Sequence, residues 1–155
     1  FTSAKGLGGG IPIGAMMCKH FCDVFAPGEH ASTFGGNPFA CAVALTVCQT
    51  IEREHLLDNV TARGEQLRTG LRAIAAKYPA LITDVRGWGL IHGMELAAER
   101  EIVAADVVKA ALAEGLLLVP AGAQVLRFVP PLIVSEAELD AALQIVERVI
   151  ATLNM

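Results

Sequence analysis

Lys5 is the first residue whose surroundings suggest chemistry. It is followed at once by Gly6-Leu7-Gly8-Gly9-Gly10, so little side-chain bulk crowds its C-terminal side. A flat cofactor ring can lie against bare backbone there, as a Schiff-base lysine requires. The alternative is a solvated lysine in a flexible loop. Neither a phosphate loop nor a dinucleotide fingerprint fits, because the lysine precedes the glycines and no strand precedes the lysine.

Two adjacent hydroxyls form a second candidate site. Ser32 and Thr33 precede Phe34-Gly35-Gly36-Asn37-Pro38, in which Asn37 suits a helix N-cap and Pro38 suits the first helical turn. Hydroxyls and backbone N–H groups that converge near a helix N-terminus can bind an anion. A cluster that serves only capping and turn formation is the other interpretation.

Arg127 is the third candidate, since it lies between Leu126 and Phe128 in a strand-like segment. An arginine is costly to bury in an apolar strand unless it meets a carboxylate, although an edge strand would leave its head in water. Arg86, before Gly87-Trp88-Gly89, is expected to be structural, as a clamp on backbone or between domains. The four histidines share no spacing with an acid or nucleophile that suggests a triad.

The elements that must position these residues follow from periodicity and turn residues. An apolar helix over 39–54, apolar on nearly every face, is expected to be buried. An amphipathic helix over 56–77 is stopped by Pro79, and an S-x-x-E capping box at Ser135 and Glu138 begins the last helix. Before these helices we expect a loop over 1–14 that leads into a short strand, a strand remnant and short helix over 15–26, and a loop over 26–37. After the helix over 56–77 we expect a hairpin over 82–96 and a helix over 104–113 ended by Gly115. Strands over 116–119 and 125–128 and a helix to about 153 complete the order.

Composition excludes several classes of function. The chain has 155 residues, a net charge of -4, 54% hydrophobic residues and only 18% charged residues. Without a basic excess, neither nucleic acid nor an anionic membrane is an expected partner. No apolar run reaches the roughly 18 residues of a membrane helix, and the start has no signal-peptide layout. A globular chain that opens on a glycine-rich loop without an initiator Met is expected to be cut from something longer.

The cysteines are expected to be structural thiols. Cys18 and Cys22 flank His20, but zinc ligands usually pair more tightly and in two pairs, so no metal site is predicted. Cys41 and Cys48 have the spacing of one helix face. Buried free thiols in a reducing cytoplasm are the expectation.

Four ordered motifs resemble those of class III (ornithine/acetylornithine-type) aminotransferases. They are the lysine segment Thr2–Ala15, the segment His30–Pro38, Val85-Arg86-Gly87-Trp88-Gly89-Leu90, and Leu126-Arg127-Phe128-Val129-Pro130-Pro131-Leu132. The resemblance covers the whole chain and is strongest to the acetylornithine enzymes, although succinylornithine and ornithine enzymes share most of these segments.

The resemblance implies a role for each candidate residue. Lys5 would be the Schiff-base lysine for pyridoxal 5'-phosphate (PLP) and the proton shuttle. Thr33 would bind the cofactor phosphate of the partner subunit in a homodimer, Ser32 would lie beside the substrate, and Arg127 would face a substrate carboxylate. The implied reaction moves an amino group from N-acetylornithine or a related ornithine derivative to 2-oxoglutarate, in cytoplasmic arginine biosynthesis.

The implied fold is the α/β fold type I of PLP-dependent transferases. Residues 1–54 would be the end of the large PLP-binding domain, with the lysine loop, the phosphate loop and the buried helix. Residues 55–155 would form the complete α+β small domain. The family's other phosphate loop, its ring-stacking aromatic and the aspartate for the pyridine nitrogen are absent from the chain, so the chain alone is expected to be inactive. The alternatives are a non-catalytic small-domain binding or assembly module, and a class III relative that acts on another ω-amino donor or with other chemistry, such as an aminomutase or decarboxylase.

Overall fold

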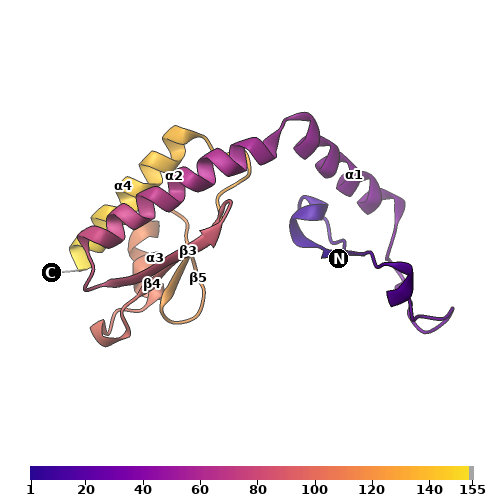
Figure 1. Cartoon of the computed structure of the whole chain (residues 1–155), viewed down its shortest axis with the longest axis horizontal. Coiled ribbons are helices and arrows are strands. Elements are labelled where there is room, and N and C mark those ends of the chain that lie inside the picture. The colour runs from indigo at the N-terminus through magenta and orange to yellow at the C-terminus, as the bar shows by residue number, and fades with distance from the viewer. Residues whose placement is uncertain (154–155) are drawn as a thin grey trace. The chain divides into compact units, whose positions relative to one another are not determined.

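The computed structural model describes residues 1–153 and divides the chain into two compact units (Figure 1). The first unit runs from Phe1 to His55, and the second begins at Leu56. Each unit is described by itself.

The first unit begins with a short strand pair that closes the lysine loop. Strand β1 (Thr2–Ser3) pairs antiparallel with β2 (Ala15–Met16), and the 3-10 helices η1 (Lys5–Gly8) and η2 (His20–Cys22) lie in and beyond the loop. The strand and short helix expected over 15–26 are confirmed. The short strand expected over 11–14 is not formed, and Pro12 there has no N–H to donate to a strand ladder.

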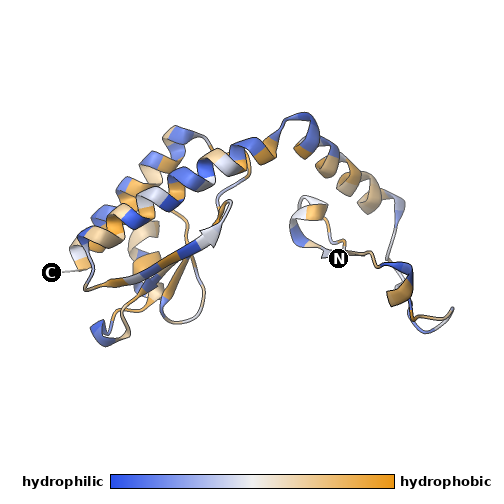
Figure 2. Ribbon diagram, in the orientation of Figure 1, coloured by the Kyte–Doolittle hydropathy of each residue, from blue (hydrophilic) through white to orange (hydrophobic). Residues whose placement is uncertain are grey.

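Helix α1 (Pro38–Arg53) completes this unit, and its start is the predicted one. The Asn37 side chain accepts a hydrogen bond from the Ala40 N–H at 2.9 Å, and Pro38 occupies the first turn. Within the described residues little covers the helix, since only Ala40 and Ala44 are buried. The reason is that the glycine loop covers only part of its surface, and Figure 2 shows hydrophobic colour along much of α1.

The cysteines correct a related expectation. All four are free, but all four are exposed, including Cys41 and Cys48 on α1. Their helix-face spacing was interpreted correctly as helical, whereas the cover that would bury them is not supplied by the other residues of the first unit.

The second unit packs three helices on one antiparallel sheet. The sheet order is β3-β4-β6-β5, with every neighbouring pair antiparallel. Its elements are α2 (Leu56–Lys77), β3 (Ile82–Trp88), β4 (Ile91–Leu96), the 3-10 helix η3 (Ala98–Arg100), α3 (Ala104–Ala113), β5 (Val119–Pro120), β6 (Val125–Phe128) and α4 (Glu136–Leu153). The predicted helices, hairpin and strand over 125–128 are confirmed. The strand expected over 116–119 is shorter and shifted, because only Val119 and Pro120 pair with β6.

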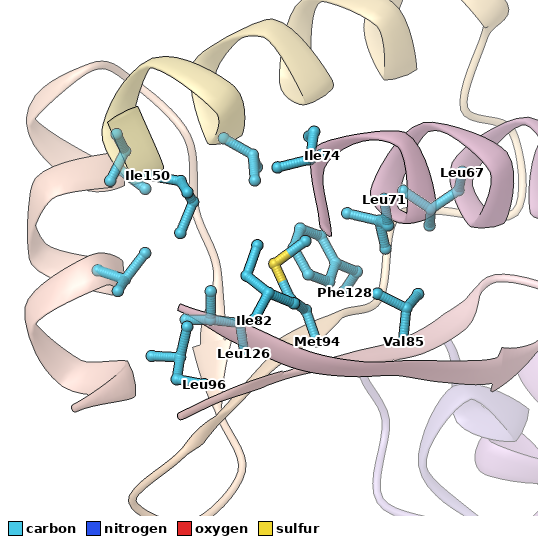
Figure 3. Close-up of a cluster of buried hydrophobic side chains, with 14 of the residues drawn as sticks. Leu67, Leu71, Ile74, Ile82, Val85, Met94, Leu96, Leu126, Phe128 and Ile150 are labelled. Carbon is cyan, nitrogen blue, oxygen red and sulfur yellow. The ribbon is translucent and has the colours of Figure 1, made fainter. Parts of the chain in front are cut away.

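One hydrophobic core holds the second unit together. Leu67, Leu71 and Ile74 on α2 face side chains from the sheet, as Figure 3 shows. Met94 and Leu126 are fully buried at the centre of their strands, and Ile150 adds α4. Burial of side chains of this size contributes about 1.5–3 kcal/mol each, so this unit has the larger part of the chain's apolar stabilisation.

No helix within residues 1–153 combines the length and apolar character needed to cross a membrane.

A close backbone approach joins α2 to the hairpin. A Cβ on Gly64 would lie 2.3 Å from the Gly89 carbonyl oxygen, so only glycine lets the helix and the β3–β4 turn touch. Gly89 itself has a φ of +55°, which glycine adopts without steric cost. This contact fixes where the Gly87-Trp88-Gly89 turn sits on the helix.

Candidate functional site

Lys5 lies at the start of η1 in an unusual backbone conformation. Its φ is 54°, in the left-handed region that residues other than glycine rarely occupy, and its side chain is exposed. Such a conformation costs about 1–3 kcal/mol and persists where the surroundings determine it, often at functional sites. His55 and Glu101 share this left-handed conformation, so the φ value marks a locally determined backbone at Lys5 and does not by itself assign a function.

The glycine loop supplies those surroundings. Its turns close through hydrogen bonds from the Leu7 N–H to the Ala4 carbonyl oxygen and from the Gly9 N–H to the Gly6 carbonyl oxygen, both at 3.1 Å. Gly8 is buried, and a Cβ on Gly9 would lie 3.2 Å from the Val47 side chain of α1. The loop is thus held by its own backbone and packed on α1, which fixes the base of Lys5.

The structure leaves open space beside the lysine. A Cβ built on Gly6 or on Gly10 would meet no atom within 4 Å. The loop therefore has bare backbone on its open side, next to the amine-bearing side chain. A planar ring can approach here without displacing a side chain, so these residues fit a pyridoxal-type cofactor.

The hydroxyl pair divides into one engaged and one free group. Ser32 Oγ accepts a hydrogen bond from the Gly35 N–H at 3.0 Å, which closes a turn before α1. A Cβ on Gly35 would clash with Ser32 at 2.8 Å, so this turn needs glycine. Thr33 is exposed, and its hydroxyl has no hydrogen-bond partner among residues 1–153. Because Asn37 already caps α1, Thr33 is available for an anion.

Arg127 lies in the second unit on β6, where it is exposed between two buried neighbours. Leu126 and Phe128 point into the core, so the Arg127 side chain leaves the opposite face of the strand. No carboxylate pairs with it among the described residues. It also borders a cavity of about 500 Å³ whose walls are mostly apolar. The β6 strand is internal to the sheet rather than an edge, which corrects one alternative, while the guanidinium does reach solvent.

Arg86 is structural, as expected, but its partners differ from the expected ones. Arg86 Nη1 donates to Asp84 Oδ2 at 2.7 Å and to Glu95 Oε2 at 2.5 Å. These two carboxylates raise the pKa of Arg86, first Asp84 and then Glu95. It therefore clamps two carboxylates, Asp84 on its own strand and Glu95 across the hairpin, rather than backbone.

His92 is a buried polar residue that no sequence pattern singled out. It is 2% exposed, and its Nε2 lies 2.8 Å from the Gly89 carbonyl oxygen, while Nδ1 has no partner within the described residues. The contact ties β4 to the hairpin turn. No pattern in the sequence marks His92. In the structure it lies opposite Gly87, and a Cβ on Gly87 would lie 2.7 Å from His92 Nδ1.

The candidate residues are thus divided between the two units. Lys5, Ser32 and Thr33 belong to the first, on segments before α1, and Arg127 belongs to the second. Within residues 1–153 no group of three or more His, Cys, Asp or Glu side chains is arranged to hold a metal ion.

The described residues thus offer an exposed lysine on a glycine loop in the first unit and an arginine without a carboxylate partner among residues 1–153 in the second. Residues 1–150 match the family described as "Aminotransferase class-III". The chain belongs to the class III aminotransferases, as its motifs predicted, and the α/β fold expected from them is confirmed.

Curated relatives agree along the whole chain. It is 74% identical to an acetylornithine aminotransferase of Nostoc sp. over 154 residues, which is 99% of this chain and 36% of that protein. An acetylornithine aminotransferase of Synechocystis sp. is 65% identical, with 99% and 36% covered. The chain therefore spans about a third of the length of these relatives.

Solved structures of similar fold are also aminotransferases. Ornithine δ-aminotransferase of Plasmodium falciparum superimposes with a TM-score of 0.92 at 27% identity, over 99% of this chain and 40% of that one. Acetylornithine aminotransferase of Elizabethkingia anophelis gives 0.87 at 32% identity, over 97% and 38%. A Toxoplasma gondii ornithine aminotransferase, similar at 0.76 and 34% identity over 83% and 30%, has PLP at partial occupancy in its active site.

Proposed function

We propose that this chain is part of a PLP-dependent transaminase that moves an amino group from N-acetylornithine, or a related ornithine derivative, to 2-oxoglutarate. The observation that carries the proposal is the strained, exposed Lys5 on a packed glycine loop with open space beside it. The high identity to acetylornithine aminotransferases supports the choice of amino donor.

Each residue has a task that its surroundings permit. When bound, PLP supplies an electron sink that lets a proton leave the carbon bearing the amino group. Lys5 would hold the cofactor through its amine, and as a free amine it would accept and return that proton. Thr33 would donate a hydrogen bond from its hydroxyl to the phosphate of the partner subunit's cofactor. Arg127 pairs with a substrate carboxylate, for which a guanidinium provides two parallel donors.

Ser32 has a narrower role than Thr33. Its oxygen already accepts from the Gly35 N–H, but its hydroxyl proton remains free to donate. We place it beside the substrate, where it contributes one donor and holds the turn that presents Thr33.

We further propose that residues 1–54 belong to the large cofactor-binding domain and residues 55–155 form the small domain. The working enzyme would be a cytoplasmic homodimer, with Thr33 serving the partner's cofactor, in arginine biosynthesis. Since the chain spans about a third of its relatives, the 155 residues alone should not turn over substrate.

Covalent trapping tests the central assignment. Whole enzyme that carries this sequence should absorb in the imine band of bound PLP, and borohydride should fix the cofactor on Lys5. Lys5→Ala should abolish turnover and leave the thermal midpoint of the cofactor-free enzyme nearly unchanged, because the exposed Lys5 side chain makes few contacts. Recovery of the reduced adduct on Lys19, Lys77 or Lys109 would overturn the assignment.

The amino donor needs its own assay. Acetylornithine, succinylornithine, ornithine and lysine should be compared with 2-oxoglutarate as acceptor by measuring glutamate formation. The largest kcat/KM is expected for acetylornithine. A preference for lysine, whose aminotransferase from M. tuberculosis is a structural neighbour at 34% identity and a TM-score of 0.73 over 82% of this chain, would keep the reaction class and change the substrate.

A further inference from the structure

The face of the sheet opposite the helices carries charged side chains on three neighbouring strands, β3, β4 and β6. Val85, Met94 and Leu126 point into the core, so their strand neighbours point to the other face. There Arg86 on β3, Gly93 on β4 and Arg127 on β6 are direct partners in register. The two arginines therefore flank a residue without a side chain.

Glu95 lies two residues beyond Gly93 on the same face. It is a diagonal neighbour of Arg86 on one side and of Arg127 on the other, because both arginines are opposite Gly93. Long side chains reach across such diagonals of about 7–8 Å. Glu95 therefore has one arginine on a diagonal of each neighbouring strand, and the Val125 side chain, which a Cβ on Gly93 would meet at 3.1 Å, lies beside the diagonal toward Arg127.

The structure shows which pairing is formed. Glu95 Oε2 lies 2.5 Å from Arg86 Nη1, and the same nitrogen lies 2.7 Å from Asp84 Oδ2. Arg127 has no carboxylate partner among residues 1–153. Glu95 is therefore paired with Arg86 on β3, the neighbouring strand that lies on the other side of β4 from Arg127.

A freed Glu95 would compete with a substrate for Arg127. A carboxylate tethered on the neighbouring strand has an effective concentration in the millimolar range or above, comparable with that of a dissolved carboxylate substrate. Because like charges also repel, an unpaired Glu95 beside Arg127 would lower the local affinity for any anion.

We propose that Arg86 is a positioning residue that holds Glu95 away from Arg127 and so keeps the Arg127 guanidinium free for a substrate carboxylate. The proposal rests on the proposed function, in which Arg127 binds that carboxylate. Arg86 itself does not touch the substrate. Asp84 supports it by holding the same Nη1 group.

Steady-state kinetics of the whole enzyme that carries this sequence test the proposal. Arg86→Ala should raise the KM for 2-oxoglutarate about tenfold and leave kcat at saturating substrate within twofold. Glu95→Gln alone should leave KM at or slightly below the wild-type value. The double variant Arg86→Ala/Glu95→Gln should return KM to within twofold of wild type, because the competing carboxylate is gone.

The double variant separates the inference from its rivals. If it remains as impaired as Arg86→Ala, Arg86 contacts the anion directly or supports the fold, and the positioning role is wrong. An unchanged KM in Arg86→Ala also overturns it. Should Arg86→Ala give no soluble enzyme, Arg86→Gln and Arg86→Gln/Glu95→Gln make the same comparison with the side-chain length largely kept.

Arg127→Ala serves as the reference for the proposed function. It should raise the KM for 2-oxoglutarate at least as far as Arg86→Ala does. If Arg127→Ala leaves KM unchanged, the carboxylate role of Arg127 fails. If Arg127→Ala raises KM and Arg86→Ala does not, only the positioning role of Arg86 fails.

Discussion

For Lys5, the residue type alone does not tell a cofactor-binding lysine from a solvated one, and the backbone conformation adds information. Lysine frequency alone favours a solvated side chain, and only the following glycines suggested a cofactor. The left-handed φ of 54° could not be read from the sequence, because lysine seldom adopts it. For Thr33, the sequence alone could not separate an anion-binding hydroxyl from a capping one. In the structure Asn37 caps α1 and Ser32 closes the turn, so the Thr33 hydroxyl serves neither purpose.

Thr33→Ala should weaken cofactor binding without loss of fold. One hydrogen bond to a charged phosphate is worth about 1.5–3 kcal/mol, or about tenfold to a hundredfold in affinity. Titration of the whole apoenzyme with PLP measures the dissociation constant, and Thr33→Ser is the matched control because it keeps the hydroxyl. A wild-type dissociation constant together with a lowered thermal midpoint would instead assign Thr33 to the turn.

At the scale of elements, the helices and the hairpin could be predicted well because their signals are local. The start of α4 is an example: Glu138 Oε2 accepts from the Ser135 N–H at 2.8 Å, and the Glu138 N–H donates to Ser135 Oγ at 3.3 Å. The S-x-x-E motif alone indicated this box. Strand β5 was predicted poorly, because its two residues are defined by pairing with β6, which is a long-range property.

The capping box should make stability depend on pH. The hydrogen bond from the Ser135 backbone N–H, and then that from its hydroxyl, lower the pKa of Glu138. A carboxyl with a lowered folded-state pKa stabilises above its unfolded pKa, and the contribution is lost as pH falls through the folded value. Thermal midpoints of wild type and Glu138→Gln should therefore differ at pH 7 and converge in the acid range below about pH 4.5. A constant difference down to pH 2 would show that the box acts by other means.

Two glycines of α2 allow a matched test of the hairpin contact. Ala replaces Gly in a helix with a gain of about 0.5–1 kcal/mol, so both Gly64→Ala and Gly70→Ala share that benefit. At Gly64 the new methyl would meet the Gly89 backbone at 2.3 Å, which cannot move without shifting the turn. At Gly70 it would meet the Leu143 side chain at 2.3 Å, which can change rotamer.

Gly64→Ala should therefore be destabilised by about 1–3 kcal/mol, and Gly70→Ala should be much less affected. Denaturant unfolding monitored by circular dichroism gives both values, and Trp88 fluorescence reports the turn. Equal effects at the two sites would mean that the turn yields as easily as a leucine side chain.

At the scale of the whole molecule, the second unit has a continuous core and the first does not. The periodicity of residues 56–77 correctly indicated a one-sided helix, with the buried face now seen against the sheet. The all-round apolar character of α1 correctly indicated a helix that needs cover. What covers it could not be predicted, since a helix shows its own hydrophobic surface and not its partner.

The exposed apolar surface of the first unit predicts that the 155-residue chain associates. Phe39 and Leu45 on α1 are 66% and 58% exposed, and Phe21 and Phe34 in the preceding segments are 80% and 81% exposed. Since burial of each large apolar side chain is worth about 1.5–3 kcal/mol, contact between copies through α1 is strongly favoured over solvation.

Sedimentation velocity should show dimers or larger species at micromolar concentration. Phe39→Ser/Leu45→Ser should shift the distribution toward monomer, whereas Leu112→Ser, at a 55% exposed site on α3, should not. A clean wild-type monomer with residues 38–53 protected from hydrogen exchange would contradict the prediction, because it would mean that the chain covers α1 by itself.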